Sequence, residues 1–205
     1  MKIKICGLNP TRDVQTCIDL NVHFLGFVFY DKSPRNTDLK EISVLKRYNP
    51  KKSHYVSVCV DPTDTFLQEN ILGNFEYIQL HGSETSERVK EINKMGIKVI
   101  KAIKVKEQKD VSQYKNYEDV ANLILFDSTS MEKSQSISKD LLSNLPRGEK
   151  FGLAGAINLK NIREYSQLGF NFLDLSSGLE RENLKGYKDH LKIKSFMNKI
   201  YELKN

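Results

Sequence analysis

The feature that most constrains the fold of this 205-residue chain is a regular alternation of eight short apolar runs with longer polar segments. The runs are rich in Val, Ile, Leu and Phe, as parallel strands covered by helices require. They span Ile3–Cys6, Phe24–Phe29, Tyr55–Val60, Tyr77–Leu80, Val99–Ile103, Leu123–Phe126, Phe151–Ala154 and Phe172–Leu175. Eight strand–helix units without a linker predict an α/β protein, a (β/α)8 or TIM barrel, with residues 1–205 as one domain.

A doubly wound open sheet is the alternative arrangement of the same elements. Such a sheet usually carries fewer strands, and its first turn often reads GxGxxG. Here the first run ends in Cys6-Gly7-Leu8, which lacks that pattern. We therefore favour the closed barrel.

The polar segments contain signals for where helices begin. Asn9 and Asp61 each precede a proline, which predicts an N-cap followed by proline at the first helical position. Thr37 is predicted to cap another helix, with Asp38 in its first turn. The last segment places four apolar residues on one helical face, namely Ile193, Phe196, Met197 and Ile200.

Composition narrows the class of protein. No run approaches the ~20 apolar residues of a membrane span, and the first residues lack the pattern of a secretory signal. The three cysteines, Cys6, Cys17 and Cys59, are odd in number and form no CxxC pair, so neither a disulfide framework nor a zinc site is indicated. We expect a cytoplasmic protein with no bound metal.

The formal net charge of +6 raises the question of a nucleic-acid partner. The lysines are scattered among acidic residues over the whole chain and do not form one basic segment. We therefore expect no nucleic-acid partner and no membrane partner. A mild positive field would help attract a small anionic substrate.

Chemistry in a barrel of this kind takes place where strands end, so the residues that follow each run are the candidates. Cys6 ends the first run, and a thiol in an electropositive mouth can reach a useful thiolate fraction; a lone cysteine is also typical of core packing. Asp127 follows four apolar residues, and a partly desolvated carboxyl there could act as a general acid. A simple turn cap is the alternative for Asp127. Cys17 and Cys59 are assigned to packing.

The candidates for binding lie in other loops at the same end. The guanidinium of Arg35 suits a carboxylate, and a solvated arginine is the alternative. His81 either contacts a ligand or is structural. Gly155-Ala156 and Ser177-Gly178 follow the last two runs, where barrels often bind phosphate through backbone N–H groups. Two ordinary tight turns would also explain these small residues.

Several segments, taken in order, resemble the phosphoribosylanthranilate isomerase family. They are Lys4-Ile5-Cys6-Gly7-Leu8, Phe24-Leu25-Gly26-Phe27-Val28-Phe29-Tyr30, Lys32-Ser33-Pro34-Arg35, Gln79-Leu80-His81-Gly82, Lys101-Ala102, Leu153-Ala154-Gly155, Asp174-Leu175-Ser176-Ser177-Gly178-Leu179-Glu180 and Gly186-Tyr187-Lys188-Asp189. The resemblance runs from the first strand to the last loop. It implies a barrel enzyme of tryptophan biosynthesis that converts N-(5-phosphoribosyl)anthranilate to 1-(2-carboxyphenylamino)-1-deoxyribulose 5-phosphate by an Amadori rearrangement.

The resemblance also implies roles for individual residues. The catalytic cysteine and aspartate of the family correspond to Cys6, as the base, and Asp127, as the acid. Arg35 matches the motif arginine and is expected to bind the anthranilate carboxylate. Asp174 matches the strand-eight aspartate and is expected to position sugar or amine. The family implies no metal or organic cofactor, and the monomer is its common form.

The chain departs from the family pattern at two loops. Residues 132–138 replace a glycine-rich lid and contain no glycine, which restricts the backbone. The usual AGGL reads Ala154-Gly155-Ala156-Ile157, and a left-handed conformation would cost Ala156 about 1 kcal/mol. An alternative function is therefore a barrel that binds a phosphorylated metabolite with weak or no turnover. A related isomerase of the histidine pathway would use paired aspartates, and Cys6 argues against it.

Overall fold

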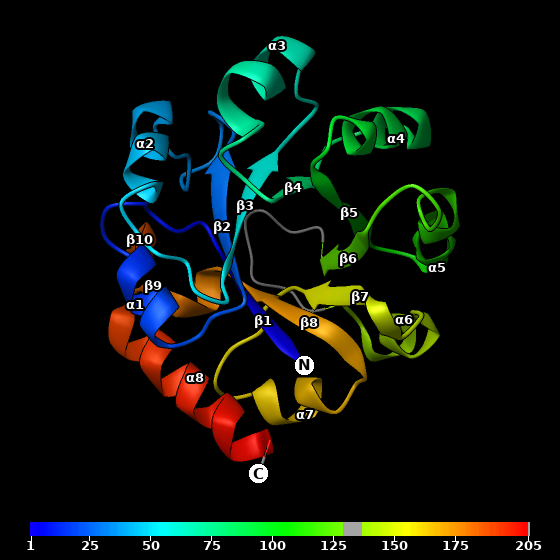
Figure 1. Ribbon diagram of the computed structural model, residues 1–205. Coiled ribbons are helices and arrows are strands. Elements are labelled where there is room, and N and C mark those ends of the chain that lie inside the picture. The colour runs from blue at the N-terminus through cyan, green and yellow to red at the C-terminus, as the bar shows by residue number, and fades with distance from the viewer. Residues whose placement is uncertain (129–136, 205) are drawn as a thin grey trace.

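The computed structural model describes residues 1–128 and 137–204, in which eight parallel strands close into a barrel. Each strand pairs with the next along the chain, and β8 pairs with β1. The strands are β1 (Lys2–Cys6), β2 (Phe24–Phe29), β3 (His54–Cys59), β4 (Tyr77–Leu80), β5 (Lys98–Val105), β6 (Leu123–Ser128), β7 (Gly148–Ala154) and β8 (Phe170–Leu175). The predicted (β/α)8 barrel is confirmed, and Figure 1 shows its strands as an inner ring surrounded by helices.

Helical segments follow the strands and cover the outside of the barrel. They are α1 (Val14–Asp19), η1 (Leu39–Glu41), α2 (Ile42–Leu45), α3 (Asp64–Phe66), η2 (Leu67–Ile71), α4 (Ser86–Lys94), α5 (Gln108–Val111), η3 (Ser112–Asn116), α6 (Lys139–Asn144), α7 (Ile162–Ser166), η4 (Ser177–Leu179) and α8 (His190–Lys204). After η4, the short antiparallel pair β9 (Glu180–Arg181) and β10 (Leu184–Lys188) precedes α8. None of the helices in the described part of the chain combines the length and apolar character needed to cross a bilayer.

Strand ends differ from the sequence prediction mainly where a strand continues through polar residues. β2 and β4 have the predicted bounds, but β6 continues through Asp127 to Ser128. Asp127 pairs with Lys104 of β5, so it lies within the strand and not after it. The apolar pattern marks buried residues only, whereas the hydrogen-bond ladder also continues where side chains face the mouth of the barrel.

The three predicted N-caps are wrong, and each has a physical reason. Asn9 closes a turn before α1, accepting from the N–H groups of Thr11 and Arg12, and the helix itself begins after Asp13. Thr63 caps α3, because the Asp61 carboxylate accepts from the N–H of Ser83 in the loop after β4. Asp38 caps η1, by accepting from the N–H of Lys40.

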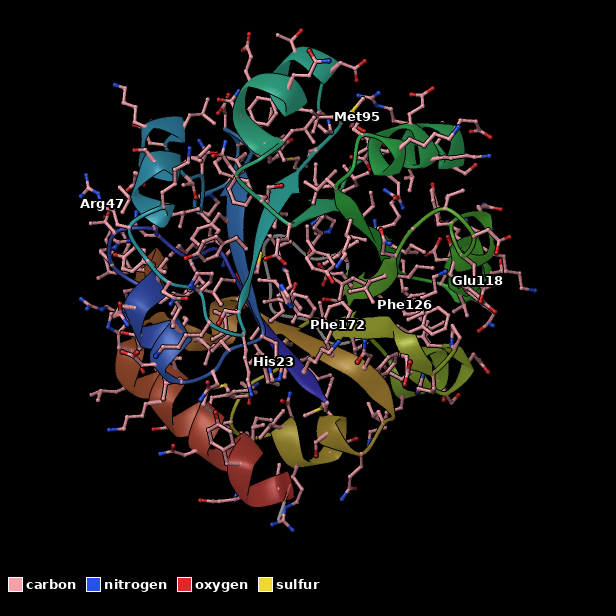
Figure 2. All side chains as sticks on the ribbon, viewed as in Figure 1. His23, Arg47, Met95, Glu118, Phe126 and Phe172 are labelled. Atoms are coloured by element: carbon pink, nitrogen blue, oxygen red, sulfur yellow. The ribbon has the colours of Figure 1, made fainter. Side chains whose placement is uncertain are left out.

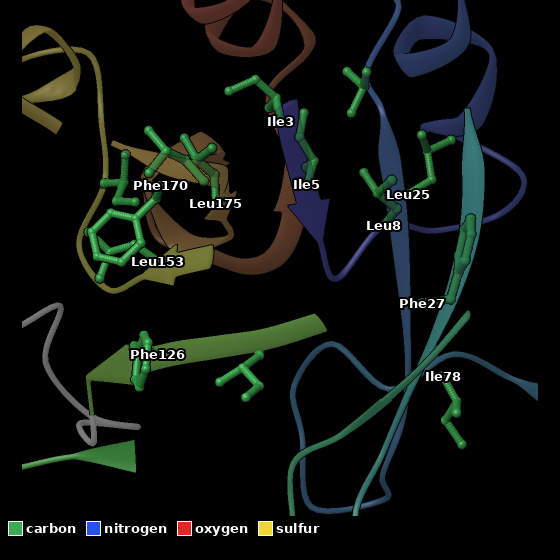
Figure 3. Close-up of a cluster of buried hydrophobic side chains, with 14 of the residues drawn as sticks. Ile3, Ile5, Leu8, Leu25, Phe27, Ile78, Phe126, Leu153, Phe170 and Leu175 are labelled. Carbon is green, nitrogen blue, oxygen red and sulfur yellow. The ribbon is translucent and has the colours of Figure 1, made fainter. Parts of the chain in front are cut away.

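The hydrophobic residues form two layers. Ile3 and Ile5 of β1 belong to the outer layer between strands and helices, part of which Figure 3 shows. The outer layer also contains the predicted apolar face of α8. The second cluster comprises Phe24, Val56, Ile100, Leu123, Leu125, Ala154 and Phe172. Figure 2 shows Phe172 nearer the middle of the ring than Phe126, which packs against Tyr114 of η3. Alternate residues of each strand therefore fill the barrel, and polar groups are left at its C-terminal end.

Candidate active site

The predicted catalytic residues lie at the same end of the barrel. Cys6 is the last residue of β1, and Asp127 and Asp174 are each next to last in β6 and β8. His81 follows β4, and Arg35 lies in the loop after β2. Because the strands are parallel, their C-terminal ends form one rim, which is where barrel enzymes carry their active sites.

Cys6 lies next to polar groups at this rim. Its ladder partner on β2 is Gly26. A Cβ atom at Gly26 would stand 3.2 Å from the Nζ of Lys4 and 3.4 Å from the Sγ of Cys6. The missing side chain of Gly26 therefore leaves room for an ammonium group and a thiol together. Ser176 donates a hydrogen bond to the carbonyl of Cys6 at 3.1 Å.

Lys4 and Asp174 form a buried ion pair inside the barrel. The Nζ of Lys4 donates to the Oδ2 of Asp174 at 2.7 Å, and the side chain of Lys4 is completely buried. The other carboxylate oxygen, Oδ1, is buried and has no hydrogen-bond partner among the described residues. Because an unpaired buried acceptor is unfavourable, this oxygen is suited to accept a hydrogen bond from a ligand.

The sequence reasoning missed Lys4, although a signal was present. Ile3 and Ile5 face the helices, so alternation along the strand turns Lys4 into the barrel. A lysine at an inward position of a barrel strand needs a buried carboxylate as its partner.

Asp127 is set up to keep a proton near neutral pH. Burial, and then the Asp174 carboxylate, raise the pKa of Asp127 to about 7, although the Lys4 charge opposes the shift. The Nε2 of His81 lies 3.4 Å from the Oδ2 of Asp127. Burial, and then the charges of neighbouring lysines, lower the pKa of His81 to about 4, so its imidazole is neutral at pH 7. Asp127 is therefore partly protonated in the neutral range, as a general acid must be.

The surroundings of Cys6 disfavour the ionised form that a general base needs. Burial raises the pKa of Cys6, and the Asp174 carboxylate adds to the increase. The positive charges of Lys4, Lys188 and Arg35 oppose it. The thiolate is therefore the minor form at neutral pH, and its population depends on these cations.

Arg35 is held by a carboxylate that the sequence reasoning did not single out. Its Nε and Nη2 donate to the two carboxylate oxygens of Glu180 at 2.6 and 3.0 Å. Lys188 also contacts Glu180, at 3.3 Å, and donates to the carbonyl of Ser176. Burial opposes ionisation of Glu180, but the Arg35 hydrogen bond and the Lys188 charge lower its pKa overall. The pairing orients the guanidinium and turns its Nη1 end away from Glu180.

The predicted phosphate loops are neighbours at the rim. Gly155 and Ala156 both have positive φ angles, of 103° and 50°, so Ala156 adopts the left-handed conformation whose cost is given above. Gly178 packs against the preceding loop, because a Cβ there would stand 2.4 Å from the carbonyl oxygen of Ile157. The loops after β7 and β8 therefore lie against each other.

Substitutions in this loop should change stability in opposite directions. Gly155→Ala should destabilise the protein by about 2 kcal/mol, because φ is positive and the new Cβ would stand 2.6 Å from the Oγ of Ser128. Ala156→Gly should stabilise it by about 0.5 kcal/mol, since relief of the left-handed strain exceeds the entropy that glycine adds to the unfolded chain. Urea unfolding of both variants measures the difference. A destabilised Ala156→Gly variant would contradict this account.

A second buried ion pair fixes the loop that carries His81. Lys101 of β5 donates to Glu84 at 2.6 Å, and both side chains are buried. Glu84 also accepts from the backbone N–H groups of Asp61 and Gly82. A pocket of about 340 Å³ opens beside this pair and reaches His81.

Lys101→Met should lower the free energy of unfolding by about 3–5 kcal/mol, because Glu84 would remain as an unpaired buried charge. Urea denaturation measures the loss. Lys106→Met, at an exposed lysine of the same pocket, is the matched control and should change stability by about 0.5 kcal/mol or less. Adding Glu84→Gln to Lys101→Met should recover part of the loss. Equal stabilities of Lys101→Met and the control would refute the role of the pair.

The glycine-poor loop at 132–138 lies largely outside the described residues, of which it includes only Ile137 and Ser138. Ile137 is buried, and Ser138 caps α6 by accepting from the N–H of Leu141. Within the described ranges, no three His, Cys, Asp or Glu side chains gather as a metal site would require.

Comparison with known proteins places this arrangement in a family. Residues 3–199 match the family model of N-(5'phosphoribosyl)anthranilate (PRA) isomerase. The N-(5'-phosphoribosyl)anthranilate isomerase of Caulobacter vibrioides is 33% identical over 98% of this chain and 96% of its own length.

Solved structures agree with the sequence comparison. A phosphoribosyl anthranilate isomerase in complex with reduced 1-(o-carboxyphenylamino)-1-deoxyribulose 5-phosphate superposes with a TM-score of 0.81, at 26% identity over 98% of this chain and 99% of that one. Monomers generated from the dimeric enzyme of Thermotoga maritima superpose with a TM-score of 0.80, at 26% identity and the same coverage. The chain therefore belongs to the N-(5'-phosphoribosyl)anthranilate isomerase family.

Proposed function

We propose that this protein converts N-(5-phosphoribosyl)anthranilate to 1-(2-carboxyphenylamino)-1-deoxyribulose 5-phosphate, an aldose–ketose isomerisation of tryptophan biosynthesis. The observation that carries the proposal is the pairing of proton donor and acceptor at one rim. Asp127 has a pKa raised to about 7, and Cys6 lies beside the buried ammonium of Lys4. Both groups feel the charges of Lys4 and Asp174, so they share one electrostatic environment.

The reaction needs one acid and one base. Protonated Asp127 donates to the furanose ring oxygen as the C1–O bond breaks, and the lone pair of the aniline nitrogen forms an iminium ion. The Cys6 thiolate then removes the acidified proton from C2. The electron pair of that C–H bond forms the C1–C2 double bond of an enolamine, which tautomerises to the ketone.

Four kinds of contact would hold the substrate. Arg35 binds the anthranilate carboxylate with the Nη1 end of its guanidinium, which Glu180 leaves free. The unpartnered Oδ1 of Asp174 accepts from the sugar or the amine, and the neutral imidazole of His81 contacts the substrate beside Asp127. The backbone N–H groups of four residues bind the phosphate, at Gly155, Ala156, Ser177 and Gly178.

We further propose that residues 1–205 act as one catalytic domain, as a monomer in the cytoplasm, without metal or organic cofactor. The closure of the barrel within residues 2–175 supports one domain. Sedimentation at micromolar concentration tests the monomer, and a sedimenting dimer would refute it.

The test of the function is loss of substrate fluorescence on mixing N-(5-phosphoribosyl)anthranilate with the purified protein. Enzymatic turnover predicts loss of the whole signal at substoichiometric protein. The alternative, a barrel that binds phosphorylated metabolites with weak or no turnover, predicts a signal that stays at the level of the Asp127→Asn control. That outcome would overturn the proposed isomerase, and the presence of both proton-transfer groups argues against it.

A further inference from the structure

We propose that Lys4 is a positioning residue that supplies the counter-charge for the Cys6 thiolate, and that Asp174 sets how much of that charge reaches Cys6. The catalytic consequence rests on the proposed function, whereas the effect on thiol ionisation does not. Lys4 would act through Cys6 without touching the substrate.

The geometry places the ammonium of Lys4 between two acidic groups. Its Nζ lies 2.7 Å from the Oδ2 of Asp174 on β8. The same Nζ and the Sγ of Cys6 lie 3.2 and 3.4 Å from one point, the position of a Cβ at Gly26. A side chain at residue 26 would crowd both groups. One cation is therefore shared by a carboxylate and a thiol.

The charged groups around Cys6 leave one positive charge unbalanced. Those nearest to it are Lys4 on β1, Asp174 on β8, Arg35 after β2, Glu180 on β9 and Lys188 on β10. Three cations thus face two carboxylates. Across the mouth, His81 on β4 is neutral near pH 7 and Asp127 on β6 is partly protonated. Ionisation of the Cys6 thiol brings the cluster to neutrality.

Among the three cations, Lys4 has the largest effect on the ionisation of the thiol. Each of the three is paired with a carboxylate, Arg35 and Lys188 with Glu180 and Lys4 with Asp174. Lys4 differs because its Nζ and the Sγ of Cys6 both lie within 3.4 Å of the Cβ position at Gly26. Lys4 is completely buried, and charges interact over short distances most strongly where water is excluded. Its partner Asp174 also repels the thiolate, so the two residues act on Cys6 in opposite directions.

The test is the rate at which iodoacetamide alkylates Cys6 between pH 6 and 10, followed peptide by peptide by mass spectrometry. Cys17 and Cys59 are buried and serve as internal reporters of unfolding. Lys4→Met should slow alkylation of Cys6 about tenfold or more at pH 8, because loss of a nearby charge disfavours the thiolate. Asp174→Asn should accelerate it at the same pH, because the repelling charge is removed. Lys4→Arg should retain most of the native rate.

The expected changes in alkylation rate have opposite signs in Lys4→Met and Asp174→Asn. Loosening of the rim would instead expose Cys6 and accelerate its alkylation in both variants, so the signs distinguish an electrostatic effect from structural damage. An unchanged or faster alkylation in Lys4→Met would overturn the proposal. If Lys4→Met does not fold, Asp174→Asn decides alone, and a rate no faster than that of the native protein overturns the proposal. Alkylation that follows the expected order in a protein without isomerase turnover would leave this inference standing and refute the proposed function.

Discussion

Replacing Cys6 with alanine, or Asp127 with asparagine, should lower kcat by about 100-fold or more, the usual scale for loss of a general acid or base. In the proposed mechanism, Cys6→Ala removes the group that takes the C2 proton, and Asp127→Asn removes the proton that the ring oxygen needs. The substrate contacts at Arg35 and the phosphate loops remain, so KM should change less than kcat. Initial rates from substrate fluorescence measure both parameters.

Loss of stability should not explain the loss of activity. The pKa of Asp127 rises from 3.8 to about 7 in the folded protein, so the folded state holds a proton that the unfolded chain releases. Ionised Asp127 therefore opposes folding increasingly as the pH rises towards 7. Asp127→Asn removes this opposition, and it should unfold at an equal or higher urea concentration at pH 8. A Cys6→Ala variant with near-native kcat would end the assignment of the base.

The pH dependence of activity follows from the same two groups. The profile of kcat/KM should be a bell whose acidic limb, near pH 7, belongs to Asp127 and whose alkaline limb belongs to Cys6, with a pKa that burial raises above the usual range of a thiol. The reactive form needs a protonated Asp127 and an ionised Cys6, but the pKa order is the reverse. Below pH 7 the thiolate population grows tenfold per pH unit while Asp127 stays protonated, so the rate rises. Above the pKa of Cys6 the thiol is fully ionised, while the protonated fraction of Asp127 continues to fall, so the rate falls.

Between the two limbs the gain in thiolate cancels the loss of protonated carboxyl, so the rate is flat. The reactive form is then a small minority of the molecules, because the pKa of Cys6 is raised by burial and lies above that of Asp127. The assignment is checked by comparing the alkaline limb with the alkylation profile of Cys6. Coincidence of thiol titration with the acidic limb would contradict the assignment of the two limbs.

The eight strands and the loops that follow them show where local sequence suffices. Short apolar runs that alternate with longer polar segments predicted all eight strands. The end of a parallel strand is also a local feature, and parallel ends share one rim. The residues Cys6, Asp127, Asp174 and His81 could therefore be assigned to one mouth without coordinates. Ala156 stands where the family pattern has a glycine, and its φ angle is positive.

The sequence alone determined the closed ring of strands, the rim where barrel enzymes carry their chemistry and the two candidate proton-transfer groups on it. Only the tertiary structure decided which charges surround those groups. Lys4 and Asp174 are 170 residues apart, and Arg35 and Glu180 are 145 apart. The register between β1 and β8, and the fold of the β9–β10 pair over Arg35, bring these partners together. Periodicity describes one segment at a time, whereas the field at a buried thiol is a sum over every element that packs around it.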